Sequence, residues 1–159
     1  MKITFILPAL TEATSPYWRP IKYALFPPLG LATLAAHCAP DDDVSLFDEH
    51  VETVPLDGPT PDVVAIQVYI TNAWRAYELA DHFRERGAHV ILGGLHVTSL
   101  PEEAAAHADT IVTGPADASF VEFLADFRAG RAKARYDSPE RSLVGIPPIR
   151  RDLIKRHLY

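Results

Sequence analysis

The sequence is poor in cysteine and carries no excess of positive charge. It has one cysteine in 159 residues, Cys38, so it can form neither a disulfide framework nor a cysteine-based metal cluster by itself. Cys38 falls in an apolar helical pattern, where we expect a buried structural thiol. The formal net charge of −6 disfavours a nucleic-acid partner, because such a partner needs a basic face.

Long hydrophobic runs are also absent. No stretch approaches the roughly 20 apolar residues that span a bilayer. The N-terminal apolar run is short and is interrupted by Pro8, whereas a signal peptide has a longer apolar core and a small-residue cleavage site. We therefore interpret this run as a first strand and expect a reducing, cytoplasmic setting.

Several catalytic and nucleotide-binding motifs are missing. No G-x-G-x-x-G follows the first apolar run and no G-x-x-x-x-G-K-[ST] occurs, which disfavours a standard dinucleotide site and excludes a P-loop. No Ser-His-Asp or Cys-His arrangement can be defended. Asp48 and His50 could suggest a metal site, but they lack a third ligand at usable spacing. We therefore predict no catalytic residue and no metal ligand in this chain.

What the sequence does contain is a regular alternation of strand and helix patterns. At 48% hydrophobic and 23% charged residues, the composition is that of a soluble globular protein of about one domain. The expected strands are Lys2–Leu7, Val44–Asp48, Val63–Val68, His89–Gly93 and Thr110–Gly114. Helices are expected at Leu29–Cys38 and Ala73–Arg86, and after capping residues Ser99 and Ser119.

These elements predict an α/β fold. The strands are short and almost continuously apolar, which is typical of a parallel sheet covered on both faces. Five βα units predict a flavodoxin-like, Rossmann-like doubly wound sheet of five strands with helices on both faces. We expect the strand order 2-1-3-4-5 rather than the dinucleotide-binding order.

Two stretches fall outside this repeat. The long first loop, Ala9 to Pro28, carries four aromatic residues, and we expect it to pack over a ligand or a neighbouring domain. Those aromatics are Tyr17, Trp18, Tyr23 and Phe26. The stretch Arg131 to Tyr159 is rich in Arg, Lys and Pro and shows no sixth strand–helix unit. We interpret residues 1–130 as the domain and 131–159 as a connector to a missing domain.

Three loops at one edge of the predicted sheet could form a binding site. Ligands of open α/β sheets lie outside the carboxyl ends of the strands. The loops there, Tyr69–Trp74, Gly93–Ser99 and Gly114–Ser119, are small or polar and suit a large planar or branched ligand. Gly93-Gly94 alone fits either a tight turn or a close approach to a ligand, and His96 alone is equally ambiguous.

At this point the sequence resembles a known family. Pro27-Pro28-Leu29-Gly30, and Gly93-Gly94-x-His96-x-Thr98 followed by Leu100-Pro101-Glu102-Glu103, occur in order and at matching intervals. They resemble the N-terminal cobalamin-binding domain of cobalamin-dependent radical SAM enzymes. The resemblance covers about residues 1–130, and the tail is similar to the connector that leads into the barrel of those enzymes.

The resemblance implies a cofactor and a site. The family's domain binds cobalamin (vitamin B12) at the carboxyl edge of a flavodoxin-like sheet, with the nucleotide tail extended into the domain. By motif match, the cofactor-binding residues are Tyr69, Ile70, Thr71, Gly93, Gly94, His96, Val97, Thr98, Gly114, Pro115 and Ala116. In this interpretation His96 is a hydrogen-bonding residue of the site rather than a metal ligand.

Two departures from the family pattern concern the details of the site. Family members often have Gly-Glu-Gly-Glu after the fifth strand, where this chain has Gly114-Pro115-Ala116-Asp117. Related cobalamin domains supply a cobalt-binding histidine from Asp-x-His-x-x-Gly after the first strand. Here Asp48-Glu49-His50 follows the second strand and Thr53 replaces the glycine, so we do not expect His50 to bind cobalt.

The resemblance also implies what this chain leaves to its parent enzyme. A radical SAM barrel needs C-x-x-x-C-x-x-C for its [4Fe-4S] cluster, and one cysteine cannot supply it. S-adenosylmethionine and the cluster would then belong to a C-terminal radical SAM domain of the same polypeptide, commonly a methyltransferase. The main alternative is a degenerate scaffold of the same fold that docks without a cofactor. A flavin-binding or receiver-like module fits less well, because the first loop cradles no phosphate and no acidic residue follows the third strand.

Overall fold

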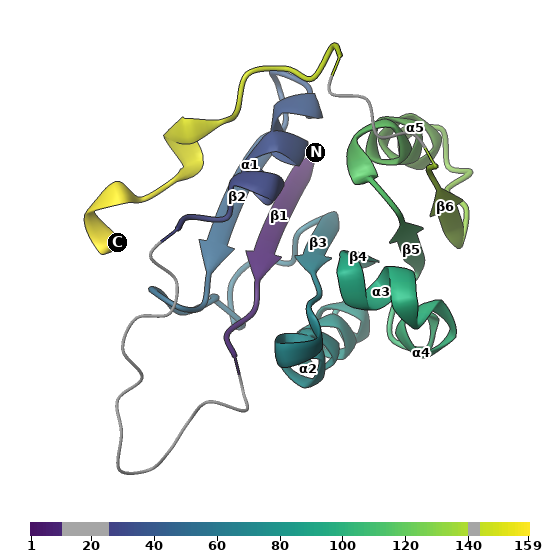
Figure 1. Ribbon diagram of the computed structural model, residues 1–159, viewed down its shortest axis with the longest axis horizontal. Coiled ribbons are helices and arrows are strands. Elements are labelled where there is room, and N and C mark those ends of the chain that lie inside the picture. The colour runs from purple at the N-terminus through teal and green to yellow at the C-terminus, as the bar shows by residue number, and fades with distance from the viewer. Residues whose placement is uncertain (11–25, 140–143) are drawn as a thin grey trace.

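A six-stranded parallel sheet forms the centre of the protein (Figure 1). The computed structural model describes residues 1–10, 26–139 and 144–159. The strands are β1 (Lys2–Leu7), β2 (Asp43–Asp48), β3 (Val63–Gln67), β4 (His89–Gly93), β5 (Thr110–Thr113) and β6 (Arg135–Asp137). Their order is β2-β1-β3-β4-β5-β6, and every neighbouring pair is parallel. The predicted order 2-1-3-4-5 is therefore confirmed for the first five strands.

The prediction of five strands was wrong, because β6 adds a sixth from the stretch interpreted as a connector. Val112 of β5 lies opposite Tyr136 of β6. Tyr136 is 3% exposed, and its hydroxyl donates to Asp126 Oδ2 at 3.0 Å and accepts from the Lys133 amide at 2.9 Å. A strand of three residues with one buried side chain shows no alternation in the sequence. The strand β6 is recognised only because it pairs with the edge of β5.

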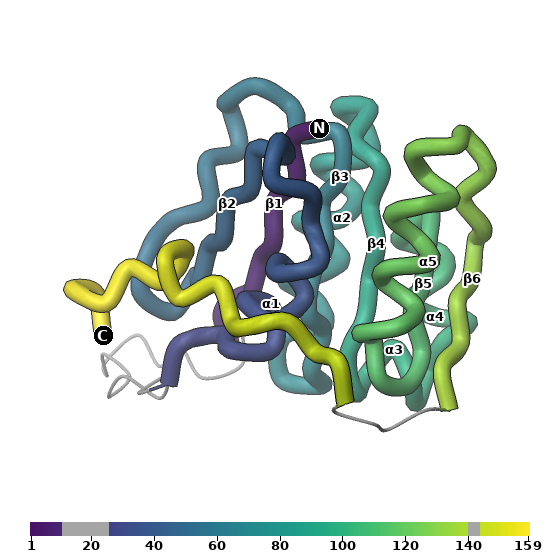
Figure 2. The backbone as a smooth tube through the Cα atoms, turned by 90° about the horizontal axis from the view of Figure 1, so that it is seen from above, coloured from purple at the N-terminus to yellow at the C-terminus, as the bar shows by residue number. Residues whose placement is uncertain are grey.

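Helices cover both faces of the sheet (Figure 2). The α helices are α1 (Leu29–Leu34), α2 (Ala73–Glu85), α3 (Leu95–Ser99), α4 (Pro101–Ala105) and α5 (Ala116–Arg128). Short 3-10 turns are η1 (Ala35–His37), η2 (Ile70–Asn72), η3 (Arg151–Leu153) and η4 (Arg156–Leu158). Helices α1 and α5 lie in front of the sheet in Figure 2, and α2, α3 and α4 lie behind it. The predicted two-faced α/β class is thus confirmed.

Strand alternation divides the core into two layers. Phe5, Ala65 and Ile91 point toward α1 and α5, where they join Phe120 and Phe123. The residues next to them in each strand point to the opposite face, where they pack with α2, α3 and α4. Because successive side chains of a strand point to opposite faces, strands buried on both sides must be apolar throughout.

Two helix starts differ from their predicted positions. Ser99 ends α3, and its hydroxyl donates to the carbonyl of Leu95 at 3.0 Å, so α4 begins at Pro101 without a side-chain cap. Helix α5 begins at Ala116, and Ser119 is buried inside it at 3% exposure. Helix α3 lies in a segment that the sequence pattern predicted as loop.

The C-terminal segment runs back across α1 towards β2 (Figure 2). The Arg150 amide donates to the carbonyl of Ala32 at 3.1 Å, and Ile154 is buried against the core on the α1 side. Tyr159 reaches the end of β2. Within the described ranges, no helix is long and apolar enough to cross a membrane. Three of the first-loop aromatics, Tyr17, Trp18 and Tyr23, lie outside the described residues, while Phe26 is 80% exposed.

Candidate functional site

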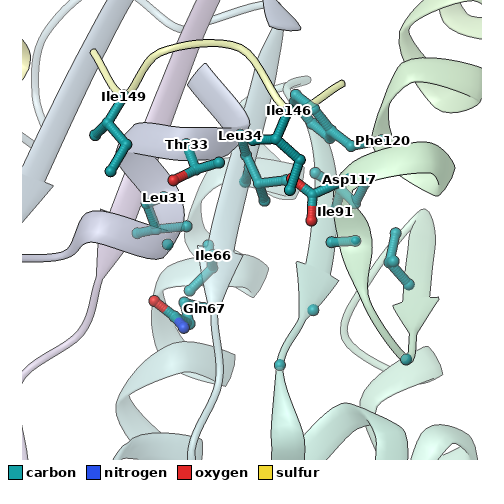
Figure 3. Close-up of a pocket in the computed structure, with 17 residues that line it drawn as sticks. Leu31, Thr33, Leu34, Ile66, Gln67, Ile91, Asp117, Phe120, Ile146 and Ile149 are labelled. Carbon is teal, nitrogen blue, oxygen red and sulfur yellow. The ribbon is translucent and has the colours of Figure 1, made fainter. Parts of the chain in front are cut away.

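A trough of about 540 Å³ lies on the α1 and α5 side of the sheet and reaches its carboxyl edge (Figure 3). Its lining residues are Gly30, Leu31, Thr33, Leu34, Ala65, Ile66, Gln67, Ile91, Gly93, Gly94, Val112, Gly114, Ala116, Asp117, Phe120, Ile146 and Ile149. The trough therefore combines three strand ends, two helices and the C-terminal segment. This position is the one that doubly wound sheets use for ligands.

The surfaces of the trough are mainly apolar. Ala65, Ile91 and Val112 line it from neighbouring strands, because each is the side chain that its strand directs toward α1 and α5. Ile146 and Ile149 come from the C-terminal segment and close the trough on the side away from the sheet (Figure 3). An apolar trough with few polar groups is typical of a site for a large organic ligand.

Gly94 and Gly114 are glycines because of the backbone. Gly94 has φ +119°, and a Cβ there would lie 2.6 Å from the Val68 carbonyl oxygen. Gly114 has φ +75°, and its Cβ would collide with the Ser138 carbonyl. Both residues adopt conformations that side chains rarely allow. Each glycine thus lets two chain segments meet at the carboxyl edge.

Gly30 and Gly93 have no such constraint. A Cβ at Gly93 would meet only Val112, at 3.7 Å, and one at Gly30 would meet only the Gln67 amide nitrogen, at 3.8 Å. Both glycines line the trough, so larger side chains there would occupy its space. Because neither glycine has a side chain, the space beside its backbone stays open to a large ligand.

Thr98 ties two of the glycine loops together. Its hydroxyl donates to the Gly94 carbonyl at 3.0 Å and accepts from the Gly114 amide at 3.0 Å. The loops after β4 and β5 are therefore fixed to each other at the mouth of the trough. Thr98 itself is exposed and does not line the trough.

His96 and Val97 lie behind the trough, in the layer covered by α2. His96 is 8% exposed, and its Nε2 lies 3.1 Å from Glu103 Oε1, which also accepts from the Tyr77 hydroxyl at 2.9 Å. The hydrogen bond from His96, then that from Tyr77, lowers the pKa of Glu103. Burial and the bond to Glu103 raise the pKa of Tyr77. This network fixes α3 against α2 and α4.

The remaining predicted site residues lie around the same edge. Tyr69, Ile70 and Thr71 are exposed beside the trough and do not line it. Ala116 lines it, together with Gly93, Gly94 and Gly114, whereas Pro115 does not. The structure thus brings four of the predicted residues into the lining. It places the others at the rim or, for His96 and Val97, in the core.

Sequence reasoning missed several residues of this edge. Asn72 is 1% exposed, donates to the Pro8 carbonyl at 3.1 Å and accepts from the Tyr69 amide at 2.7 Å. Leu31 and Phe120 are wall residues that the helical pattern marked only as core. Gly30 was part of a quoted motif, but nothing in the sequence indicated that it opens onto the site.

Cys38 and His50, the two reactive side chains discussed above, are both engaged within the fold. Burial, then the nearby Asp42, raises the pKa of the Cys38 thiol to about 12, so this sulfur stays protonated and unreactive. In the described part of the chain, no three His, Cys, Asp or Glu residues gather as metal ligands would. His50 instead hydrogen bonds to Asp48, with Nδ1 2.7 Å from Oδ1.

Comparison with known proteins assigns the fold to a family. Residues 23–124 match the B12 binding domain. The chain belongs to the B12-binding domain family. The matched region runs from before α1 into α5 and so contains most of the trough. The resemblance that the sequence motifs indicated is confirmed at this level.

The curated relatives of this B12-binding domain are methyltransferases. It is 43% identical over 123 residues to bacteriochlorophyllide d C-8(2)-methyltransferase of Chlorobaculum tepidum, covering 77% of this chain and 26% of that protein. It is 34% identical over 110 residues to the C-12(1)-methyltransferase of the same organism, covering 69% and 24%. An uncharacterized methyltransferase of Pyrococcus horikoshii is 28% identical over 143 residues, covering 82% and 30%. The chain therefore spans about a quarter of the length of these relatives.

Proposed function

We propose that this chain is the corrinoid-binding module of a methyltransferase and that the trough receives the nucleotide tail of cobalamin. The observation that carries the proposal is the apolar trough at the carboxyl edge, left open by Gly30 and Gly93. Membership of the B12-binding domain family supports the choice of ligand. The chemistry that a bound corrinoid supplies is methyl transfer.

In this proposal the residues of the chain bind and orient the cofactor. Gly93, Gly94, Gly114 and Ala116 would hold the nucleotide tail, and the rim residues would contact the rest of the corrinoid. The rim consists of Tyr69, Ile70, Thr71, Thr98 and Pro115. His96 and Val97 would not contact the cofactor; they hold α3 in place from the opposite layer of the core. Binding, orientation and shielding are the contributions that a protein makes to cofactor chemistry.

The parent enzyme is part of the same proposal. The relatives' names support a methyltransferase, and the motifs quoted above support a cobalamin-dependent radical SAM enzyme. The cytoplasm stays the expected location of that enzyme. S-adenosylmethionine and a [4Fe-4S] cluster would then be held by a C-terminal domain of the same polypeptide. Residues beyond the sheet would serve as the connector to that domain.

Titration with hydroxocobalamin and methylcobalamin tests the binding step. We expect a saturable change in the visible spectrum and co-elution of the corrinoid with the protein in gel filtration. Gly30→Phe should weaken binding at least about tenfold, because the ring would occupy the trough. Gly30→Ala adds only a methyl group to the trough, so this variant should bind cobalamin nearly as tightly as the unaltered chain does.

A matched control uses the same ring elsewhere. Gly58 has no atom within 4 Å of an added Cβ and lies outside the trough, so Gly58→Phe should bind cobalamin like the unaltered chain. Circular dichroism would confirm that each variant is folded. A folded chain that binds neither corrinoid would contradict the proposal and favour the scaffold that docks without a cofactor.

A further inference from the structure

A strap formed by residues 145–149 crosses the trough on the side away from the sheet and runs on over α1 (Figure 2). It contains Pro147 and Pro148, which have no amide hydrogen to donate. No hydrogen bond joins Ile146, Pro147 or Pro148 to any other described residue. The strap is therefore seated by its side chains and not by backbone pairing.

The two isoleucines of the strap face the trough. Ile146 and Ile149 both line it and are half-buried (Figure 3). Ile149 also packs against the core layer beneath α1, whereas Ile146 belongs to neither core layer of the described residues. An apolar side chain that faces an open trough is only partly removed from water, and it becomes fully buried when an apolar ligand fills the space. The strap thus offers a ligand more apolar contact than the empty fold uses.

The chain is anchored directly after the strap. The Arg150 amide donates to the Ala32 carbonyl at 3.1 Å, and Ile154 is 9% exposed in the core layer beneath α1. Further along, the Tyr159 hydroxyl donates to Asp48 at 2.9 Å. The bond from Arg150 is the anchor nearest to the strap, so its amide hydrogen reports whether this part of the chain lies on α1.

We propose that filling the trough and docking the strap on α1 stabilise each other. This inference rests on the proposed function, in which the filling group is the nucleotide tail of cobalamin. A ligand that contacts Ile146 and Ile149 only when the strap is docked must favour the docked state. By linkage, docking of the strap strengthens ligand binding by the same factor. Occupancy of the trough is thereby transmitted to the C-terminal segment.

Hydrogen exchange of the Arg150 amide measures the docking. This hydrogen is bonded to the Ala32 carbonyl only while the segment lies on α1, so its exchange rate follows local opening. By NMR of the unaltered chain, saturating hydroxocobalamin should slow the exchange about fivefold or more. The Arg131 amide, which donates to the Asp126 carbonyl at 2.9 Å in the turn after α5, is the control and should exchange at an unchanged rate. Cobinamide, which lacks the nucleotide, should leave the rate at Arg150 nearly unchanged.

Substitutions in the strap test the reverse direction of the coupling. The double variant Ile146→Ser, Ile149→Ser should bind cobalamin about tenfold more weakly, because two aliphatic side chains lose their contact with the ligand. In this variant saturating cobalamin should hardly slow exchange at Arg150. Val144→Ser makes the same kind of change beside the strap, at a side chain that is 92% exposed and outside the trough. It should bind cobalamin like the unaltered chain, and circular dichroism would confirm that each variant is folded.

The outcomes distinguish this inference from the proposed function. If no corrinoid binds to the folded chain, the proposed function fails and the coupling fails with it. If cobalamin binds but exchange at Arg150 stays the same, corrinoid binding stands and the coupling is overturned. The coupling is also overturned if exchange slows equally in the double variant or with cobinamide, since the protection then does not pass through the strap and the nucleotide tail.

Discussion

At the scale of single residues, adjacent glycines at the end of β4 serve different purposes. Gly94 allows the backbone to pass the Val68 carbonyl with φ +119°. Gly93 has ordinary backbone angles and lines the trough with free space before it. Sequence reasoning treated the pair as one feature, so it could not separate the residue required for folding from the residue available for ligand binding.

Alanine substitutions should separate the two glycines. Gly94→Ala should lower the free energy of unfolding by about 2 kcal/mol or more, because the added methyl strains φ and overlaps the Val68 carbonyl. Gly93→Ala should change it by less than about 1 kcal/mol, since its Cβ meets only Val112 at 3.7 Å. Urea unfolding followed by circular dichroism measures both. Equal losses of unfolding free energy in the two variants would show that the positive φ of Gly94 is not the reason why a glycine is needed there.

At the scale of elements, the end of β2 holds the C-terminal segment. Asp48 is 1% exposed, and its carboxylate accepts from the His50 amide at 3.0 Å and from the Tyr159 hydroxyl at 2.9 Å. Burial alone would raise the pKa of Asp48, but the hydrogen bonds from His50 and Tyr159 outweigh it and lower the pKa below its ordinary value. In its ionised form, Asp48 therefore holds the Tyr159 hydroxyl of the C-terminal segment.

This arrangement predicts a pH dependence. Because the folded pKa of Asp48 is lowered, its contribution to stability is present above the ordinary aspartate pKa and is lost as pH falls through the folded value. Tyr159→Phe should lower the free energy of unfolding by about 1.5 kcal/mol near pH 6, where the carboxylate accepts a charge-assisted hydrogen bond. The difference from the unaltered chain should shrink below about pH 4. Urea titrations at several pH values would measure it, and a difference independent of pH would contradict the account.

At the scale of the whole molecule, the sheet continues past the predicted domain end. Tyr136 of β6 and Ile154 of the C-terminal segment are both buried against the core beneath α1 and α5. Ile146 and Ile149 complete the trough from the same segment. The chain after α5 therefore contributes both to the packing of the fold and to the candidate site.

Truncation tests how much these residues contribute. A chain ending at residue 130 loses β6 and should unfold about 4–8 °C below a chain ending at residue 139. The reason is that burying a large side chain such as Tyr136 contributes roughly 2 kcal/mol, and each kcal/mol shifts Tm by about 2–4 °C at this size. Differential scanning calorimetry of both chains and of residues 1–159 would measure the series. Identical Tm values for the two shortened chains would favour the predicted boundary at residue 130.

The parts of the fold that sequence predicted well are those with a strong local signal. The five longer strands and helices α1, α2 and α5 carry long apolar patterns, so their order and their faces could be inferred. The short elements β6 and α3 carry no such pattern and were missed. Asn72 was missed for a related reason: it looks like any polar loop residue until β1 and β3 place Pro8 beside it.

The α/β class, the order of the first five strands and the edge at which the loops gather could all be inferred from the amino-acid sequence alone. Those features follow from side-chain periodicity and from the geometry of parallel strands, which act along the chain. The residues that face the trough could be identified only from the three-dimensional fold. In the structure, His96 lies in the core, and Asp117 and Ile149 line the trough. Gly93 and Gly94 have separate roles. The physical reason is that the orientation of a side chain, and the close approach of two backbone segments, depend on contacts between parts of the chain that are far apart in sequence.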